Sequence, residues 1–211
     1  MGAFSKLTGQ CRKPTGRLGR FIIWTMNVHH SKGTDWGLQH VSIEKDATIL
    51  DVGCGGGRTV HKLAGIATEG RVYGIDYSEE SVAASRRANE RELEAGRVEI
   101  RHGSVSALPF SDNTFDLATA VETHVFWPDL VADMREVLRV LKPGGKLMII
   151  SESYKGMNHG KAMQKLSERM NFPFMTIDEH RELFAKAGYS DVQMFEKPDK
   201  SWMSGVGTKP P

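Results

Sequence analysis

Residues 51–57 read DVGCGGG and follow directly on the apolar run TIL. Four glycines in seven residues weaken a helix or a strand, but they allow the backbone to turn sharply or to come close to a ligand. A buried strand that leads into a glycine loop and then a helix is typical of open α/β sheets, which bind ligands at the carboxyl ends of their strands. The stretch therefore predicts an α/β fold with a ligand beside this loop.

Strand and helix patterns alternate along the rest of the chain. Apolar runs predict five strands, at 48–52, 71–76, 97–102, 115–121 and 146–151, and a closing antiparallel pair at 189–196 and 202–208. Helical patterns lie between them, from the loop to about Ala67, from Ser78 to about Ala95, over 130–141, and from the capping box Thr176/Glu179 to Gly188. This order predicts a doubly wound, seven-stranded, mostly parallel sheet with helices on both faces.

The length and composition suit one domain with an N-terminal extension. The chain has 211 residues, 39% of them hydrophobic and 26% charged. Residues 1–34 hold six Lys or Arg and no acid, so the remaining chain is net −4 although the whole is +2. We expect an N-terminal arm over 1–36 and one domain over 37–211.

Targeting and redox signals favour the cytoplasm. The apolar run FIIW is too short for a signal peptide, no stretch approaches a membrane span, and we expect no membrane partner. An organelle-targeting segment remains an alternative, because such segments are rich in Arg and poor in acids. The two cysteines, Cys11 and Cys54, give neither a disulfide framework nor a metal pair, and adjacent His29 and His30 are poorly placed for joint metal binding, so we expect no metal.

The glycine loop does not fit two common phosphate-binding patterns. A dinucleotide site would need a third glycine where Arg58 stands, and no segment reads GxxxxGK[ST]. What remains is an acid before spaced glycines: Asp51, Gly53, Gly55 and Gly57. This pattern favours a ligand that lacks a pyrophosphate and carries some positive charge.

Four ordered motifs carry a family resemblance. They are ILDVGCGGG (49–57), GIDYS (74–78), GSVSALPFSDNTFD (103–116) and VLRVLKPGGKLMII (137–150). With them the chain resembles the class I S-adenosylmethionine (SAM)-dependent methyltransferases, of the type 11 small-molecule branch. The resemblance implies SAM as cofactor, S-adenosylhomocysteine as product, and in-line transfer of a methyl group to a small-molecule acceptor.

The resemblance also implies which residues bind SAM. Asp76 ends the second strand, where its carboxylate can accept hydrogen bonds from both ribose hydroxyls; it can also cap the next helix, and the roles are compatible. Gly53 and Gly55 let the chain pass beside the methionine part, and Cys54 is expected to be a small filler there. Ser104 lies where many relatives carry an acid that binds adenine, which leaves Ser104 and the Val105 backbone as candidates. The predicted set is completed by Asp51, Tyr77 and Glu122.

The segment after the fourth strand, VETHVFWPD, should face the acceptor. A general base is needed only if the acceptor holds a proton at neutral pH. His124 is the candidate base, with a hydrogen-bonded loop histidine as the alternative, and Trp127 is a candidate pocket wall that could instead pack on the following helix.

The N-terminal arm is a candidate lid. Leu18, Phe21, Ile22 and Met26 keep helical spacing, which predicts a helix with a face to bury. In relatives the segment before the first strand commonly folds over the cofactor, so Asn27, His30 and Trp36 become candidate substrate contacts. A second candidate wall is 153–175, with Tyr154 as its candidate contact; the apolar residues near its end could line a pocket, but we favour core packing for them.

Other function classes stay open. The chain could instead be a nucleic-acid or protein methyltransferase, or a SAM-binding regulator without turnover. Nucleic acid is disfavoured, because the [DN]PP[YF] loop of exocyclic amino methylation is absent where VETHVFWP stands, and only the basic arm supports it. Either a monomer or a homodimer is compatible with the sequence.

Overall fold

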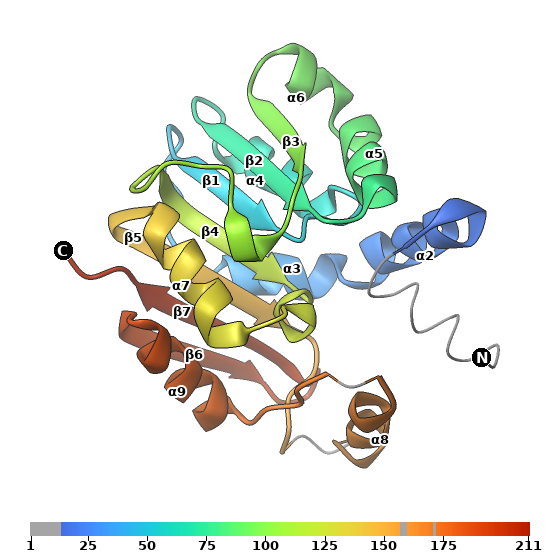
Figure 1. Ribbon diagram of the computed structural model, residues 1–211, viewed down its shortest axis with the longest axis vertical. Helices are drawn as coiled ribbons and strands as arrows, with labels where there is room; N and C mark the ends of the chain where they lie inside the picture. Colours follow the sequence, from blue (N-terminus) through green and yellow to red (C-terminus); the bar gives the residue numbers. More distant parts are fainter. Residues whose placement is uncertain (1–13, 157–159, 171) are drawn as a thin grey trace.

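A seven-stranded sheet forms the centre of the molecule (Figure 1). The computed structural model describes residues 14–156, 160–170 and 172–211. The strand order is β3-β2-β1-β4-β5-β7-β6, in which β1 to β5 are parallel and β7 runs antiparallel between β5 and β6. The strands are β1 (Thr48–Val52), β2 (Arg71–Asp76), β3 (Val98–His102), β4 (Phe115–Val121), β5 (Leu141–Ser151), β6 (Ser190–Lys197) and β7 (Trp202–Thr208). The predicted fold class is confirmed.

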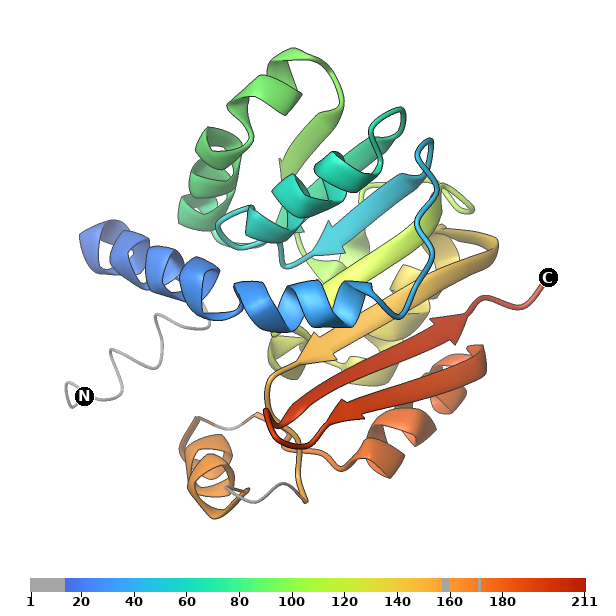
Figure 2. The ribbon, with the colours of Figure 1, turned by 180° about the vertical axis from the view of Figure 1, so that it is seen from behind.

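Helices cover both faces of this sheet. In Figure 1, α7 (Leu130–Val140) and α9 (Ile177–Ala187) lie in front of the sheet. From behind, α3 (Ser31–Leu38) and α4 (Arg58–Ile66) lie across it, with α5 (Glu79–Ala88) beside them (Figure 2). Each face has its own apolar core, one around β4, β5, α7 and α9 and one around β1, β2 and α4. The two cores hold the strand ends in fixed positions, which is where ligand contacts are expected.

Two glycines let α3 lie close against β5. Gly33 and Gly37 are one turn apart on α3. A Cβ at Gly37 would lie 2.4 Å from Cδ1 of Ile150, and a Cβ at Gly33 would lie 2.4 Å from Oε1 of Glu152. Any larger side chain would therefore push the helix off the strand or displace these groups. The segment SKGTDWGL is thereby fitted to the carboxyl end of β5.

Most helix ends follow their local signals. The capping box of Thr176 and Glu179 begins α9, and Gly188 ends it with φ of +100°. The helix expected from Ser78 to Ala95 is interrupted, however, and continues as the short α6 (Glu90–Glu94). Buried Asn89 is the cause, because its side-chain amide donates to the carbonyls of Gly57 (3.0 Å) and Ser85 (2.9 Å) while its own backbone leaves helical geometry.

The fifth strand is longer than predicted. It begins at Leu141 and includes the KPGG turn, which we expected to precede a strand from 146. Gly144 has φ of +77°, and the ladder between β4 and β5 shifts register next to it, between Phe115 and Leu117. The turn is thus accommodated as an irregularity of the strand rather than as a separate loop.

The N-terminal helix buries only part of the predicted face. In α2 (Gly16–His29), Ile22 and Ile23 are buried, but Leu18 is 47% exposed and Phe21 is 60% exposed. The helix packs mainly on α5 and α3. The prediction of Leu18 and Phe21 as buried residues was wrong; the side chain of Met26 lies outside the described part.

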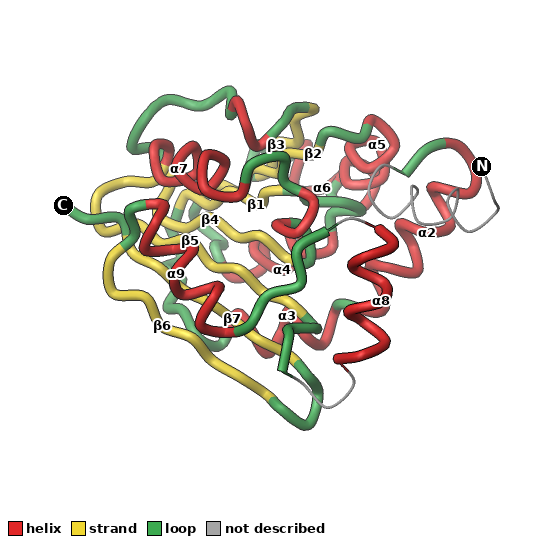
Figure 3. Tube along the Cα trace, turned by 60° about the horizontal axis from the view of Figure 1, so that its bottom comes forward, coloured by secondary structure: helices red, strands yellow, loops and turns green. Residues whose placement is uncertain are grey.

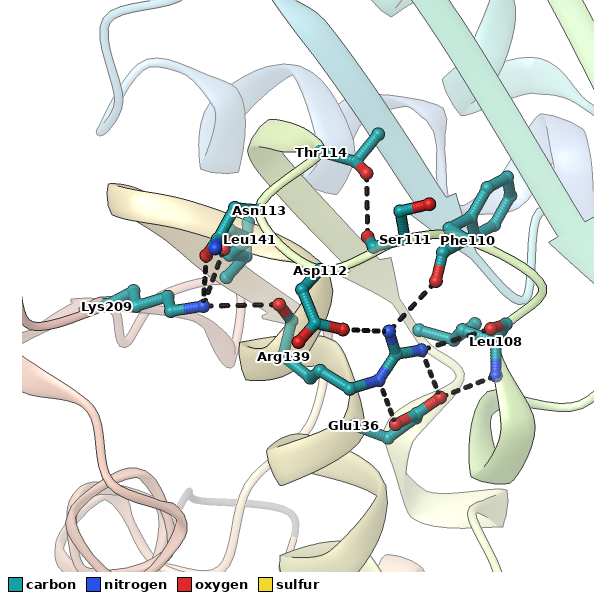
Figure 4. Close-up of polar contacts among 10 residues, drawn as sticks. All are labelled: Leu108, Phe110, Ser111, Asp112, Asn113, Thr114, Glu136, Arg139, Leu141 and Lys209. Carbon is teal, nitrogen blue, oxygen red and sulfur yellow. Dashed lines mark hydrogen bonds and ion pairs between the residues drawn. The ribbon is translucent and has the colours of Figure 1, made fainter.

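An arginine on α7 holds the long connection between β3 and β4. Arg139 donates to the carbonyls of Phe110 (2.9 Å) and Leu108 (3.1 Å) and pairs with Asp112 and Glu136, each at 2.7 Å (Figure 4). Glu136 in turn accepts from the backbone N–H of Leu108 at 2.8 Å. The connection carries Ser104 and Val105 at its start, so this network fixes the segment that the sequence assigns to adenine.

Candidate active site

The glycine loop has backbone angles that favour glycine. Gly53, Gly55 and Gly57 have φ of +74°, +50° and +80°. A Cβ at Gly53 would lie 2.0 Å from Oγ1 of Thr123, beyond β4, and one at Gly57 would lie 2.5 Å from Oγ of Ser85 on α5. At Gly55 the nearest atom would be a backbone oxygen 4.0 Å away, so space remains above the loop there. The loop is packed tightly on two sides and open on the third.

Asp76 joins this loop to the start of α5. Its Oδ2 accepts from the backbone N–H of Gly55 and its Oδ1 from that of Ser78, both at 2.9 Å. Burial raises the pKa of Asp76, and the two backbone hydrogen bonds oppose the rise. Each carboxylate oxygen has a second lone pair, so Asp76 can still accept from a ligand.

Asp51 is a more deeply buried acid at the end of β1. Its Oδ1 accepts from the hydroxyl of Thr119 at 2.7 Å. Burial raises the pKa of Asp51 to about 7. The hydrogen bond from Thr119 lowers this pKa, and the charge of Asp76 raises it further. A cationic group in the adjoining space would favour the ionised form of Asp51.

Cys54 packs as a small apolar residue. It is buried against β2, where a Cβ added at Gly74 would lie 3.0 Å from its sulfur. Burial raises the pKa of its thiol well above the ordinary value, and the nearby aspartates add to this effect. A protonated, enclosed thiol agrees with the filler role and offers no thiolate nucleophile.

Two adjoining cavities surround these groups. The glycine-loop cavity lies between the loop, the residues after β4, and the segment formed by α2 and the start of α3. It shares Gly53, Asp76, Tyr77, Thr123 and Phe126 with a second space, the Ser104 cavity. Seven of the predicted cofactor residues line the first: Asp51, Gly53, Cys54, Gly55, Asp76, Tyr77 and Glu122. The remaining two, Ser104 and Val105, line the second.

A third cavity of about 230 Å³ lies toward α8 (Gly160–Met170) and shares His30, Glu122 and Phe126 with the glycine-loop cavity. We call it the apolar cavity. Its apolar lining comes from Val125, Phe126, Met163, Leu166, Phe172, Pro173, Phe174 and Met175. Figure 3 shows α8 at the same end of the molecule as α2. Six of these eight apolar residues come from 153–175, so this segment lines a pocket and does not only complete the core.

His30 and Glu122 lie where the glycine-loop and apolar cavities meet, and Glu152 contacts both of them. Nδ1 of His30 is 2.9 Å from Oε2 of Glu152, just beyond β5. The backbone N–H of Glu152 donates to Oε1 of Glu122, just beyond β4, and Glu122 has φ of +55°. Burial acts to lower the pKa of His30, but the hydrogen bond to Glu152 and the charge of Glu122 outweigh it and raise the pKa. A non-glycine residue at positive φ is an energetic cost that often marks a functional site.

His124 also lines the apolar cavity, where it is paired with His180 of α9. His124 is 0% exposed, and its Nε2 is 3.2 Å from Nε2 of His180. Nδ1 of His180 lies 2.7 Å from the carbonyl of Thr176, which can only accept, so His180 carries its proton on Nδ1 and accepts from His124. Nδ1 of His124 is then the unprotonated nitrogen, and within the described residues it has no hydrogen-bond partner. Burial, and then His180, lower the pKa of His124 well below its ordinary value.

The other predicted substrate contacts are scattered. The Trp36 ring packs on His40 and Trp202, with centroids 4.8 and 6.1 Å away, and lines none of the three cavities. Tyr154 is also outside them, buried in the core with a hydrogen bond to Glu196. Trp127 is buried in the same core and lines the Ser104 cavity. The side chain of Asn27 lies outside the described part of the structure.

Sequence reasoning missed Glu152, His180 and Gly33. Glu152 follows β5 as Glu122 follows β4, so the rule that ligands lie at carboxyl strand ends could have found it. For His180 no local signal exists, because it is one helical position among several polar ones.

Comparison with known proteins gives the family. A family model described as a methyltransferase domain matches residues 43–196. The chain belongs to this family, and its sheet is that of the class I SAM-dependent methyltransferases. It is 33% identical to a demethylmenaquinone methyltransferase of Bacillus licheniformis over 75% of this chain and 65% of that one. It is 31% identical to an O-methyltransferase of Penicillium expansum over 69% of this chain and 53% of that one. The matches span between half and two thirds of these relatives.

Solved structures show the same fold at low identity. A chain from the complex of the Haloferax volcanii Trm112 methyltransferase activator with a methyltransferase superimposes with a TM-score of 0.80 at 21% identity, over 90% of this chain and 94% of that one. A SAM-dependent methyltransferase of Aquifex aeolicus gives 0.73 at 21%, over 90% and 98%. None of the helices within the described ranges is long and apolar enough to cross a bilayer.

SAM fits the residues present. The open space above Gly55 adjoins two buried carboxylates, Asp51 and Asp76, which suit a cationic ligand with hydroxyl groups. The molecule supplies a methyl group on a positive sulfonium, which is already a good leaving group. The chain therefore has mainly to hold donor and acceptor in line and to keep water out.

Proposed function

We propose that this protein transfers the methyl group of SAM to a small, largely apolar acceptor that carries a ring. The observation that carries the proposal is the pair of cavities that meet at His30, Glu122 and Phe126. One is lined by the glycine loop and two buried aspartates, and the other is lined mainly by aromatic side chains, methionines and other apolar residues. An acceptor in the second would meet the methyl donor where the two join.

Three roles follow for the donor side. Asp76 binds the ribose hydroxyls, and the loop at Gly53 and Gly55 passes beside the methionine part. Ser104 and the backbone of Val105 contact the adenine from the Ser104 cavity. The proposed roles fit the chemistry of these groups, because a carboxylate accepts strong hydrogen bonds from hydroxyl groups and exposed backbone groups can bind polar atoms of a ligand.

The acceptor class rests on the size and lining of the apolar cavity. At about 230 Å³ it suits one small ring system in its present form. One of the relatives named above is a demethylmenaquinone methyltransferase, and its quinone acceptor supports a ring-bearing acceptor here. A nucleic-acid strand or a protein side chain would need an open groove at this place.

The N-terminal segment is proposed as a lid. Ser78 Oγ donates to the carbonyl of Pro14 at 2.9 Å, and Lys62 donates to that of Ser31 at 3.2 Å, so the segment is fastened to α5 and α4. Pro14, Ile23 and His30 line the glycine-loop cavity. This placement supports a domain division into a lid over 1–36 and a methyltransferase domain over 37–211. A cytoplasmic location and a monomeric or homodimeric state stay predictions.

Two measurements test the proposal. Isothermal titration should show binding of SAM and S-adenosylhomocysteine and no binding of NAD. A coupled assay of S-adenosylhomocysteine release should then show turnover with substituted phenols and naphthols but not with RNA, DNA or a peptide mixture. Binding of SAM without turnover on any acceptor would instead favour the alternative, a SAM-binding regulator.

A further inference from the structure

His30 and Glu152 have the geometry of a histidine–carboxylate pair that exchanges protons with a ligand. Their contact, Nδ1 to Oε2 at 2.9 Å, joins residues 122 positions apart in the chain. An ionised carboxylate only accepts hydrogen bonds, so Nδ1 of His30 carries the proton in the neutral ring. Nε2 is then the basic nitrogen, and proton exchange with a ligand takes place there.

The pair places His30 at the junction of the two cavities, where it can act on a bound acceptor. His30 lines both the glycine-loop cavity and the apolar cavity, so it lies where the methyl donor and the acceptor would meet. His124, the sequence's candidate base, is 0% exposed and bound to His180. Both histidines line the apolar cavity, but of the two His30 also lines the glycine-loop cavity, and its side chain is 25% exposed.

The surroundings of Glu152 are shaped to hold its carboxylate. Gly33, one turn into α3, leaves room for Oε1, since a Cβ there would lie 2.4 Å from it. The backbone N–H of Glu152 is held by Glu122, so the residue is fixed at both its backbone and its side chain. Helix α3 and the ends of β4 and β5 thus position one carboxylate against one imidazole.

We propose that His30 is the general base of the reaction and that Glu152 is its positioning residue, for an acceptor whose reacting atom is a hydroxyl oxygen. The assignment rests on the proposed function. The acceptor oxygen forms a bond to the methyl carbon as the bond from that carbon to sulfur breaks and its electron pair stays on sulfur. The hydroxyl proton goes to Nε2 of His30, and the imidazolium later releases it to water. The products are a methyl ether and the neutral thioether S-adenosylhomocysteine.

The pH dependence follows from the groups around the ring. Among the described residues, the titratable groups that face His30 are Glu152 beyond β5 and Glu122 beyond β4. Their charges favour the imidazolium, so the base becomes neutral only above the ordinary histidine value of 6.5. The value of kcat/KM should therefore rise with pH as His30 loses its proton, above pH 6.5. Removing the charge of Glu152 should move this rise to lower pH.

The test compares His30→Asn and Glu152→Gln on phenols of different acidity. On phenols with a pKa near 10, His30→Asn should lower turnover about 10²–10⁴-fold, the effect of a positioned base. On 2-chloro-4-nitrophenol, which is acidic enough to be ionised at neutral pH, the same variant should lose far less turnover, and this result also shows that the variant is folded. Glu152→Gln should shift the acid limb of kcat/KM downward in pH. His61→Asn, an exposed histidine of α4, is the control and should behave as wild type.

A second perturbation leaves both members of the pair in place. Gly33→Ala adds a Cβ that must displace the Glu152 carboxylate, whereas Gly65→Ala on α4 has no atom within 4 Å. Only the first should shift the acid limb. An equal loss in His30→Asn on all phenols, or an acid limb unmoved in both Glu152→Gln and Gly33→Ala, overturns the assignment. Wild-type protein that methylates no phenol or naphthol overturns the proposed function itself, and the assignment with it.

Discussion

Asp76 is the residue whose removal should weaken SAM binding most directly. Its side chain is 8% exposed, and both oxygens already hold backbone N–H groups at 2.9 Å. A ligand hydroxyl would therefore meet a carboxylate that is fixed in position. Hydrogen bonds to a charged group contribute about 1.5–3 kcal/mol. Asp76→Ala should raise the Kd of SAM and of S-adenosylhomocysteine by roughly 10- to 150-fold.

The same substitution should also destabilise the protein, because it leaves the N–H groups of Gly55 and Ser78 without their acceptor. Each buried donor left unpaired costs about 1–3 kcal/mol. Loss of stability alone is therefore no sign of ligand binding. Asp116 supplies the matched control: it accepts from the backbone N–H of Thr48 at 2.8 Å and pairs with Lys142 at 2.7 Å, at the amino end of the sheet.

The assay is titration calorimetry of both ligands, with a thermal melt of each variant. Asp116→Asn should lower the melting temperature and keep the wild-type Kd. Asp76→Ala should change both quantities. If Asp76→Ala binds both ligands with wild-type affinity, the carboxylate serves only to hold the loop and to begin α5, and the ribose assignment is refuted.

Three further predictions concern other parts of the site. Burial raises the pKa of Asp51 from 3.8 to about 7, so between these values the folded protein holds a proton that the unfolded chain releases, and the unfolding free energy should fall as pH rises through this range. Asp51→Asn should reduce that slope in chemical denaturation and leave the part that comes from the raised pKa values of Asp76 and Glu122. Deleting residues 1–36 should leave a cooperatively melting domain with little turnover and weaker SAM binding, whereas loss of a salt-dependent affinity for RNA with turnover intact would indicate a nucleic-acid arm. His124→Asn should lower stability by about 1–3 kcal/mol through its bond to His180; a stable variant whose turnover falls about 10²–10⁴-fold would make His124 the base instead.

Local pattern was enough to predict most of the sheet. The boundaries of β1, β2, β4 and β7 agree with the apolar runs at 48–52, 71–76, 115–121 and 202–208, because each strand is buried and flanked by turn residues. The helix break at Asn89 was missed for the opposite reason. It depends on the carbonyl of Gly57, which is distant in sequence and comes near only in the folded chain.

The candidate site divides in the same way. The residues around the glycine loop were predictable, since each follows a strand whose carboxyl end meets the ligand. The exposed side of α2 was not, because helical spacing tells which residues share a face but not whether a neighbour covers it; Phe21 shares a face with apolar residues and is still 60% exposed. Glu152 and His30 form a pair only through the approach of α3 to β5, which depends on Gly33 and Gly37.

The proposed base and the loop proposed to bind SAM therefore come from different parts of the chain. The match to the methyltransferase domain begins at residue 43, so it includes the glycine loop, Asp76 and the ends of β4 and β5 but excludes His30. The family match supports the binding of SAM, because the loop and strand ends that we propose as its contacts lie within residues 43–196. The match gives no support for the proposed base, because His30 lies in the segment before residue 43. For this reason, a relative's acceptor is a guide to the acceptor of this chain only if the relative has the same pair. That pair is a histidine from the N-terminal segment and a carboxylate that follows β5.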